Sequence, residues 1–196
     1  MKYKILGGLM FFGLLGFAAR PARADTTVSV GTAGPVTVGD TFAVDVNIAN
    51  VTDLYDFQLD LTFDPTILQL DNIAEGVFLS EGGATFFFPG LIDNSGGSAT
   101  FNADTLLGAI PGVNGSGVLL QFNFEALAAG SSALSLSNVL LQDSTIPVGA
   151  NIDFSSTDGS ITVTSSGPVT TPEPNTLTLF AGAIGAGLLV ASFRRR

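Results

Sequence analysis

Carboxylates are almost the only side chains in this chain that could do chemistry. The 196 residues include 17 Asp and Glu but no His and no Cys. No Lys or Arg lies between Asp25 and Val190. A Ser-His-Asp triad, a thiolate nucleophile, a lysine Schiff base and an arginine clamp are therefore excluded from that stretch. One catalytic route remains, in which two carboxylates cleave a glycosidic bond as in glycoside hydrolases.

The acidic residues are too many and too scattered to define an active site. All but one of them fall between Asp25 and Asp158, and no spacing singles out a catalytic pair. Acids that keep a protein soluble are the simpler interpretation, so we expect no enzymatic activity. We also expect no nucleic-acid partner, because phosphate binding relies on Lys and Arg.

Calcium is the metal ion best suited to the carboxylate oxygens of these acidic residues. The short calcium loop D-x-[DN]-x-[DN]-G is missing, so the metal candidates are single acids in predicted turns and at strand ends. They are Asp40, Asp53, Asp56 and Asp93, the last beside Asn94. Solubility alone is the competing explanation for each of them. Calcium is the one cofactor that the sequence suggests.

The first 24 residues are typical of a secretory signal peptide. Lys2 and Lys4 precede an apolar run over 5–19, and Ala22-Arg23-Ala24 supplies the small-residue cleavage pattern. The apolar run is short for a membrane span. We expect signal peptidase to cut after Ala24, with a retained N-terminal anchor as the alternative. The remaining protein is predicted to be exported.

Alternating apolar and polar residues over 25–164 predict one all-β domain. The alternation is clearest in 41–63 and 118–125, and shorter strands are expected at 26–30, 99–105, 134–136 and 160–164. Turn residues separate these runs, among them Val38-Gly39-Asp40 and Asn114-Gly115. Several short strands with such turns predict a β-sandwich or jelly roll. Residues 165–171 read as a Ser/Thr/Pro/Gly linker.

The last 25 residues have three parts in a fixed order. Pro172-Glu173-Pro174 comes first, a mainly apolar segment over 177–193 follows, and Arg194, Arg195 and Arg196 end the chain. The segment can just span a bilayer, with the arginines on the cytoplasmic side of the inner membrane. A simple tail anchor is one interpretation. The order also resembles the PEP-CTERM sorting signal of Gram-negative bacteria. That resemblance implies exosortase cleavage near Pro-Glu-Pro and a cell-surface or extracellular destination after transient membrane anchoring.

A second resemblance covers most of the predicted domain. The segment 54–68, which runs from an alternating strand into Asp64-Pro65, and the preceding 38–46 resemble the early strands of bacterial cohesin domains. The resemblance implies a jelly-roll sandwich of about nine strands. It also implies a protein partner of the dockerin type, built on duplicated calcium loops.

In cohesins the partner docks on one sheet face, and the resemblance places part of that face on the strand 55–63. Its outward residues are expected to be Asp56, Gln58, Asp60 and Thr62, with Thr100, Asn102 and Asp104 on a neighbouring strand and Ser135 nearby. In Phe86-Phe87-Phe88 the period of two directs at least one ring away from the core, and Phe87 is assigned to the face as an anchor. An ordinary solvated face and a ring buried under a loop are the alternatives.

The sequence therefore predicts an exported, non-catalytic surface or matrix protein that binds a protein partner or an exopolysaccharide. A carbohydrate-binding module of the extracellular matrix is the alternative, and a glycoside hydrolase is a distant third. Stacking on sugars is disfavoured because Trp is absent and Tyr55 is the only tyrosine after signal removal. Hydrogen-bonded or calcium-bridged contact with soluble glycan stays open.

Overall fold

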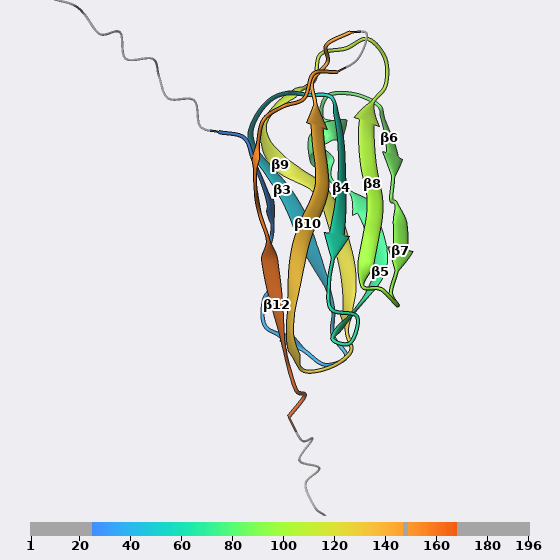
Figure 1. Cartoon of the computed structure of the whole chain (residues 1–196), viewed down its shortest axis with the longest axis vertical. Coiled ribbons are helices and arrows are strands. Elements are labelled where there is room, and N and C mark those ends of the chain that lie inside the picture. Colours follow the sequence, from blue (N-terminus) through green and yellow to red (C-terminus); the bar gives the residue numbers. More distant parts are fainter. Residues whose placement is uncertain (1–24, 147–148, 168–196) are drawn as a thin grey trace, which may run out of the picture.

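Two β-sheets pack face to face in this computed structural model, which describes residues 25–146 and 149–167 (Figure 1). The first sheet has the order β11 (Ser155–Thr157), β1 (Thr27–Val30), β3 (Thr41–Leu54), β9 (Val113–Ala126), β5 (Leu68–Glu75). The second has the order β2 (Val36–Thr37), β12 (Gly159–Thr164), β10 (Gly130–Gln142), β4 (Asp56–Thr62), β8 (Ser98–Leu106), β6 (Thr85–Phe88). A further strand, β7 (Leu91–Asp93), pairs with β8. The predicted all-β sandwich is confirmed.

The described residues hold more strand segments than the nine expected. The excess consists of short segments, since β2 has 2 residues and β7 and β11 have 3 each. The predicted strands at 41–63 and 118–125 are confirmed as β3, β4 and part of β9. They occupy the middle of their sheets, where alternation between a buried and a solvated face is strongest.

The core lies between the sheets and is built by the apolar half of each alternating strand. β3 and β9 pair antiparallel with Val44 opposite Phe122 and Phe42 opposite Phe124. β4 covers them from the other sheet with three residues that are 0% exposed: Phe57, Leu59 and Leu61. Burying a side chain of this size contributes about 1.5–3 kcal/mol each. These central strands therefore position the rest of the domain.

On one side of the sandwich, the chain crosses from one sheet to the other at two places. The chain passes from β1 in the first sheet to β2 in the second, and β11 and β12 do the same near the other end of the domain. Each pair runs parallel, β1 with β11 and β2 with β12. Residues far apart in the sequence thus close this side together.

The opposite side, between β5 and β6, is covered by a single helical turn. The turn α1 (Val77–Ser80) buries Phe78 and Leu79. Gly76 lets it approach β9, because a Cβ at Gly76 would lie only 2.1 Å from the Val118 carbonyl oxygen. Across this side the Thr85 hydroxyl of β6 donates a hydrogen bond to Glu75 of β5 at 2.6 Å.

The predicted export and sorting segments lie outside the described residues. These are the signal peptide 1–24, the segment 172–196 and its candidate span 177–193. Within the described ranges, no helix has both the length and the apolar character needed to cross a membrane.

Candidate functional site

The outer surface of β10, β4, β8 and β6, which we call the β4 face, is centred on a row of polar side chains. Asp56, Gln58, Asp60 and Thr62 alternate with the buried residues of β4. Gln58 and Asp60 are half-buried and Thr62 is exposed. On β10, Ser135 lies opposite Thr62. The predicted outward orientation of this row is confirmed.

The predicted outward orientation of Asn102 and Asp104 is wrong. Asn102 is 0% exposed and Asp104 is 1% exposed, and they lie opposite the buried Leu59 and Phe57 of β4. The cause is a β-bulge, seen as a shift in the β4–β8 register between Leu59 and Leu61. An extra residue in one strand moves every later side chain to the other face.

The residue that the bulge turns outward is Phe101. Its φ is 60°, in the left-handed region, and its side chain is 54% exposed. Thr100 is exposed as expected. Two successive residues of β8 therefore face solvent before the alternation resumes with Asn102 inside.

The three consecutive phenylalanines are divided between the faces of β6. The prediction that at least one ring points away from the core is confirmed, since Phe86 is 63% and Phe88 is 38% exposed. The assignment of Phe87 to the β4 face is wrong, because Phe87 lies opposite the buried Asp104 and packs against the core. Phe88 contacts Phe101 edge to face, with ring centroids 5.8 Å apart. We call Phe86, Phe88 and Phe101 the aromatic patch.

Asp60 connects the β4 row to both neighbouring strands. One carboxylate oxygen, Oδ1, accepts the backbone N–H of Phe101 on β8 at 2.6 Å. The other, Oδ2, accepts the side-chain amide of Asn138 on β10, also at 2.6 Å. Asn138 has a φ of 49° and follows Ser137, where the β10 register also shifts. Both oxygens of Asp60 are thus used within the sheet.

Inside the sheet, Asn102 holds the same bulge. Its side-chain amide donates to the carbonyl oxygens of Leu59 and Ala99, each at 3.0 Å. These acceptors are buried, so leaving them unpaired would cost about 1–3 kcal/mol each. Gly90, with a φ of 72°, lies over the bulge, and a Cβ there would come within 2.5 Å of the Thr100 carbonyl oxygen.

Asp104 is a buried acid beneath the β4 face. Neither of its carboxylate oxygens has a hydrogen-bond partner. Burial, with the nearby carboxylate of Glu75 next in effect and a smaller effect of Asp56, raises the pKa of Asp104 to about 7. Burial also raises the pKa of Asp56, and the Thr105 hydroxyl offsets part of that rise. The two acids are therefore harder to ionise than surface carboxylates.

The four calcium candidates do not form a common site. In the described part of the chain, no three acidic, His or Cys side chains are grouped closely enough to hold a metal ion. Thr37 donates to Asp40, and Ser95 and Gly96 donate to Asp93, which lowers the pKa of both carboxyls. The Gly112 N–H donates to Asp53 at 2.7 Å. These three carboxylates thus order turns and loops.

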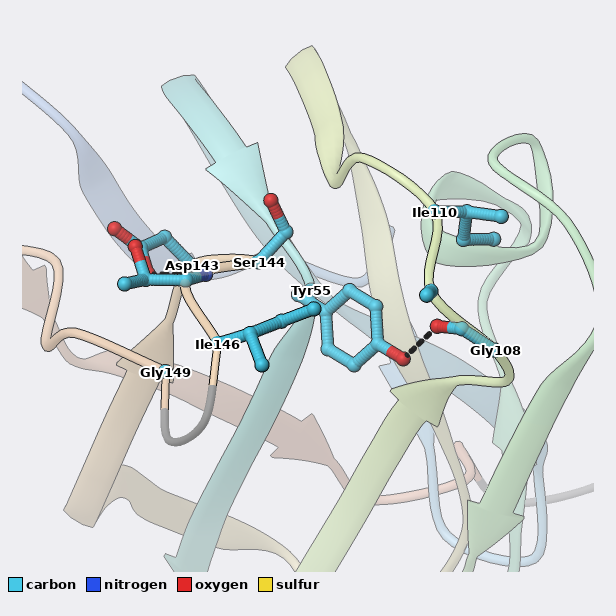
Figure 2. Close-up of a pocket in the computed structure, with 9 residues that line it drawn as sticks. Tyr55, Gly108, Ile110, Asp143, Ser144, Ile146 and Gly149 are labelled. Carbon is cyan, nitrogen blue, oxygen red and sulfur yellow. Dashed lines mark hydrogen bonds between the residues drawn. The ribbon is translucent and has the colours of Figure 1, made fainter.

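A pocket of about 410 Å³ lies at one end of the sandwich, between the segments that follow β8 and β10. Figure 2 shows the Tyr55 ring in it, with the hydroxyl directed at Gly108. That hydroxyl donates to the Gly108 carbonyl oxygen, and the Ser144 hydroxyl donates to Asp53 at 2.9 Å. Asp143 accepts the N–H groups of Thr145 and Ala150. The described polar groups of the pocket are largely used by their own loops, so the β4 face is the stronger candidate site.

A family model for the Cohesin domain matches residues 26–180. The chain belongs to the cohesin family. Cohesin domains are non-catalytic protein-binding modules, which supports the expectation of no enzymatic activity. Cohesin homologues are extracellular or cell-surface scaffolding proteins, which agrees with the predicted export.

One relative is a much longer protein. The chain is 28% identical over 176 residues to Cellulose-binding protein A of Clostridium cellulovorans. That match covers 88% of this chain but only 9% of the relative, so this chain spans about a tenth of the relative's length.

The solved structures show the shared fold. A non-cellulosomal cohesin from Archaeoglobus fulgidus is 20% identical, with a TM-score of 0.58, over 72% of this chain and 93% of that one. The seventh ScaB type I cohesin from Pseudobacteroides cellulosolvens is 19% identical, with a TM-score of 0.58, over 76% and 98% of the chains. The third ScaC cohesin of Acetivibrio cellulolyticus, solved with the ScaB dockerin, is 16% identical, with a TM-score of 0.57, over 70% and 98%.

Proposed function

We propose that this chain is an exported, non-catalytic cohesin module that binds a dockerin-bearing protein through the β4 face. The observation that carries the proposal is the composition of this face, where an exposed aromatic patch lies beside a row of polar side chains. Large exposed aromatic side chains are typical anchors of protein interfaces. The family and the dockerin complex of the Acetivibrio cellulolyticus relative support the same kind of partner.

The charge of the domain indicates what the partner must supply. The described residues contain sixteen of the seventeen acids and no Lys or Arg. Asp56 and Asp60 add negative charge to the β4 face. A partner that places Lys or Arg over this acidic row and an apolar side chain over the aromatic patch complements the surface, and opposite charges accelerate encounter. We therefore expect binding to weaken as salt is added.

Capture from the producing organism's culture tests the proposal. The full chain is immobilised and exposed to culture supernatant with calcium or with a chelator, and the retained proteins and sugars are identified. A retained protein with duplicated calcium loops is then purified and titrated by calorimetry. Gln58→Arg, at the centre of the β4 face, should weaken its binding about tenfold or more. Gln121→Arg on β9, in the opposite sheet beside Asp45, is the matched control and should change affinity less than about twofold.

Two results would count against the proposal. Equal affinity of the Gln58→Arg and Gln121→Arg variants would remove the β4 face from the interface. Enrichment of glycan alone, without any calcium-loop protein, would instead favour the alternative, a carbohydrate-binding module of the exopolysaccharide matrix.

We further propose that exosortase sorts the protein. Pro172-Glu173-Pro174, the apolar segment 177–193 and the terminal arginines Arg194, Arg195 and Arg196 support this, as does the signal pattern ending at Ala24. In cells that lack exosortase, the chain should stay in the inner membrane at the size expected after signal removal. Glu173→Ala should do the same in normal cells, whereas Thr176→Ala should not. Fractionation and immunoblotting measure both, and normal release without exosortase would refute the assignment.

A further inference from the structure

Phe101 occupies a backbone conformation that an aromatic residue rarely adopts. Its φ of 60° lies in the left-handed region, where a Cβ meets the backbone. Such conformations persist only when surrounding groups fix them, and they concentrate at ligand-binding and other functional sites. Contacts with neighbouring residues must therefore stabilise Phe101 in this conformation.

Two side chains fix the bulge from opposite faces of the sheet. Outside, Asp60 accepts the Phe101 N–H at 2.6 Å. Inside, Asn102 is 0% exposed and donates to the carbonyl oxygens of Leu59 and Ala99, which flank the bulge on β4 and β8. The hydrogen-bonding groups that an extra residue frees from the ladder are thus taken up by side chains.

The second oxygen of Asp60 ties this bulge to a neighbouring irregularity. It accepts the side-chain amide of Asn138, at the register shift of β10. One carboxylate on β4 therefore bonds residues of left-handed conformation on both adjacent strands. Because both oxygens already accept short hydrogen bonds, Asp60 is better suited to positioning its neighbours than to gripping a ligand.

The bulge places a third aromatic ring on the surface, in addition to those of Phe86 and Phe88. In an unbroken strand Phe101 would share the buried face with Ala99. In the bulge it is 54% exposed and packs edge to face with Phe88, 5.8 Å away. Phe86, 63% exposed, extends the same surface along β6. A pre-positioned cluster of rings loses little conformational freedom on binding, which favours its use as an anchor.

We infer that Phe101 is the apolar anchor of the partner interface on the β4 face, and that Asp60 and Asn102 are positioning residues that hold it outward. The inference rests on the proposed function. It specifies a partner that packs an apolar side chain against the aromatic patch. Asp60 could act by positioning Phe101 or by contacting the partner through its charge. Variants can separate these two roles, because an acceptor of the Phe101 N–H need not be charged.

The test combines binding with a readout that needs no partner. Phe101→Ala and Phe101→Gly are titrated with the dockerin identified by capture, and each should weaken binding about tenfold or more. Phe101→Gly should not lower the unfolding temperature, because glycine adopts the left-handed conformation freely. Val77→Ala, another exposed apolar residue at 67% on the helical turn between β5 and β6, is the control and should retain affinity.

Asp60 is tested with a pair of variants. Asp60→Ala removes the acceptor and should accelerate hydrogen exchange of the Phe101 amide and weaken binding, each about tenfold. Asp60→Asn keeps one uncharged oxygen acceptor for the Phe101 N–H, and the Asn138 amide can turn its own oxygen toward the new NH2 group. This variant should therefore preserve both within about threefold. A loss of affinity as large in Asp60→Asn as in Asp60→Ala would overturn the positioning role and show that the charge itself contacts the partner.

Other outcomes separate the inference from the proposal on which it rests. Full affinity in both Phe101 variants, with a loss in Gln58→Arg, would overturn the anchor and leave the β4 face as the interface. If the natural chain binds no dockerin, the proposed function and the anchor role fail together. The exchange rate of the Phe101 amide would still decide whether Asp60 positions the bulge.

Discussion

A carboxyl group buried beside another carboxylate is difficult to ionise, and Asp104 is in that position. The titratable groups that raise its pKa are Glu75 from β5 and, to a smaller extent, Asp56 on the outer side of β4, while Thr85 and Phe87 from β6 do not titrate. No Lys or Arg exists in the described residues to neutralise either acid. A proton on Asp104 removes the repulsion and supplies a donor for Glu75, so the domain holds this proton more tightly folded than unfolded.

Asp104→Asn should therefore change the pH dependence of stability. The folded pKa of about 7 lies above the ordinary value of 3.8. The associated stability is fully present below about pH 4 and is lost as the pH rises through about 7, by at most about 4 kcal/mol in total. The variant should be more stable than the natural chain at pH 8.5, with the difference shrinking toward pH 5. Urea unfolding followed by circular dichroism between pH 5 and pH 9 measures it.

The control for this experiment is Asp25→Asn, which removes an exposed carboxylate at the edge of the domain. It measures how the loss of one exposed negative charge changes stability. A curve for Asp104→Asn that ran parallel to that of the natural chain would mean that Asp104 titrates like a surface acid. Carbon-13 NMR of the Asp104 carboxyl group gives its titration midpoint directly.

The sequence predicts most accurately those strands that keep the same buried face and the same solvated face from end to end. In β4 the inward positions are all apolar and the outward ones all polar, so Phe57, Leu59 and Leu61 are correctly assigned to the core. In β8 the pattern is misleading. Ala99, Phe101 and Ala103 alternate with polar residues as if they shared one buried face, but the bulge reverses the alternation at Phe101.

The reversal was not predictable because its causes are distant in the sequence. Asp60 stabilises the bulge from β4, and Gly90 lies over it from the segment between β6 and β7. Neither contact can be seen from the seven residues 99–105 of the predicted strand. The local pattern predicts which side chains of a strand share a face, and tertiary contacts decide where the strand changes register. The Phe86–Phe88 run was informative for the opposite reason, because three adjacent rings cannot share one face of any strand.

For the whole molecule, the dominant feature is the one-sided charge. No described residue can form an internal ion pair between an acid and a Lys or Arg side chain. Repulsion among the sixteen acids of the domain acts across a distance set by the ionic strength, about 30 Å at 0.01 M and about 10 Å at 0.1 M. This repulsion destabilises the folded domain and weakens when salt is added.

Sodium chloride should therefore raise the thermal unfolding temperature of the full chain, by a few degrees between about 0.01 M and about 0.3 M. Scanning calorimetry at pH 7.5 measures the shift, and no change would mean that the acids are too far apart to interact. Calcium chloride at matched ionic strength serves as a second arm. A larger rise with calcium would favour a specific ion site, to be tested at Asp40, Asp53, Asp56 and Asp93.

The same one-sided composition affects how this domain meets proteases and reagents. Proteases of trypsin specificity cut after Lys or Arg, and the sequence offers them no such bond between Arg23 and Arg194. A tryptic digest should therefore release the domain as a single large fragment even after it has unfolded. Reagents that target lysine cannot label it between those residues. For a protein predicted to work outside the cell, its chemistry alone gives resistance to one whole class of extracellular protease, independently of how stable the sandwich is.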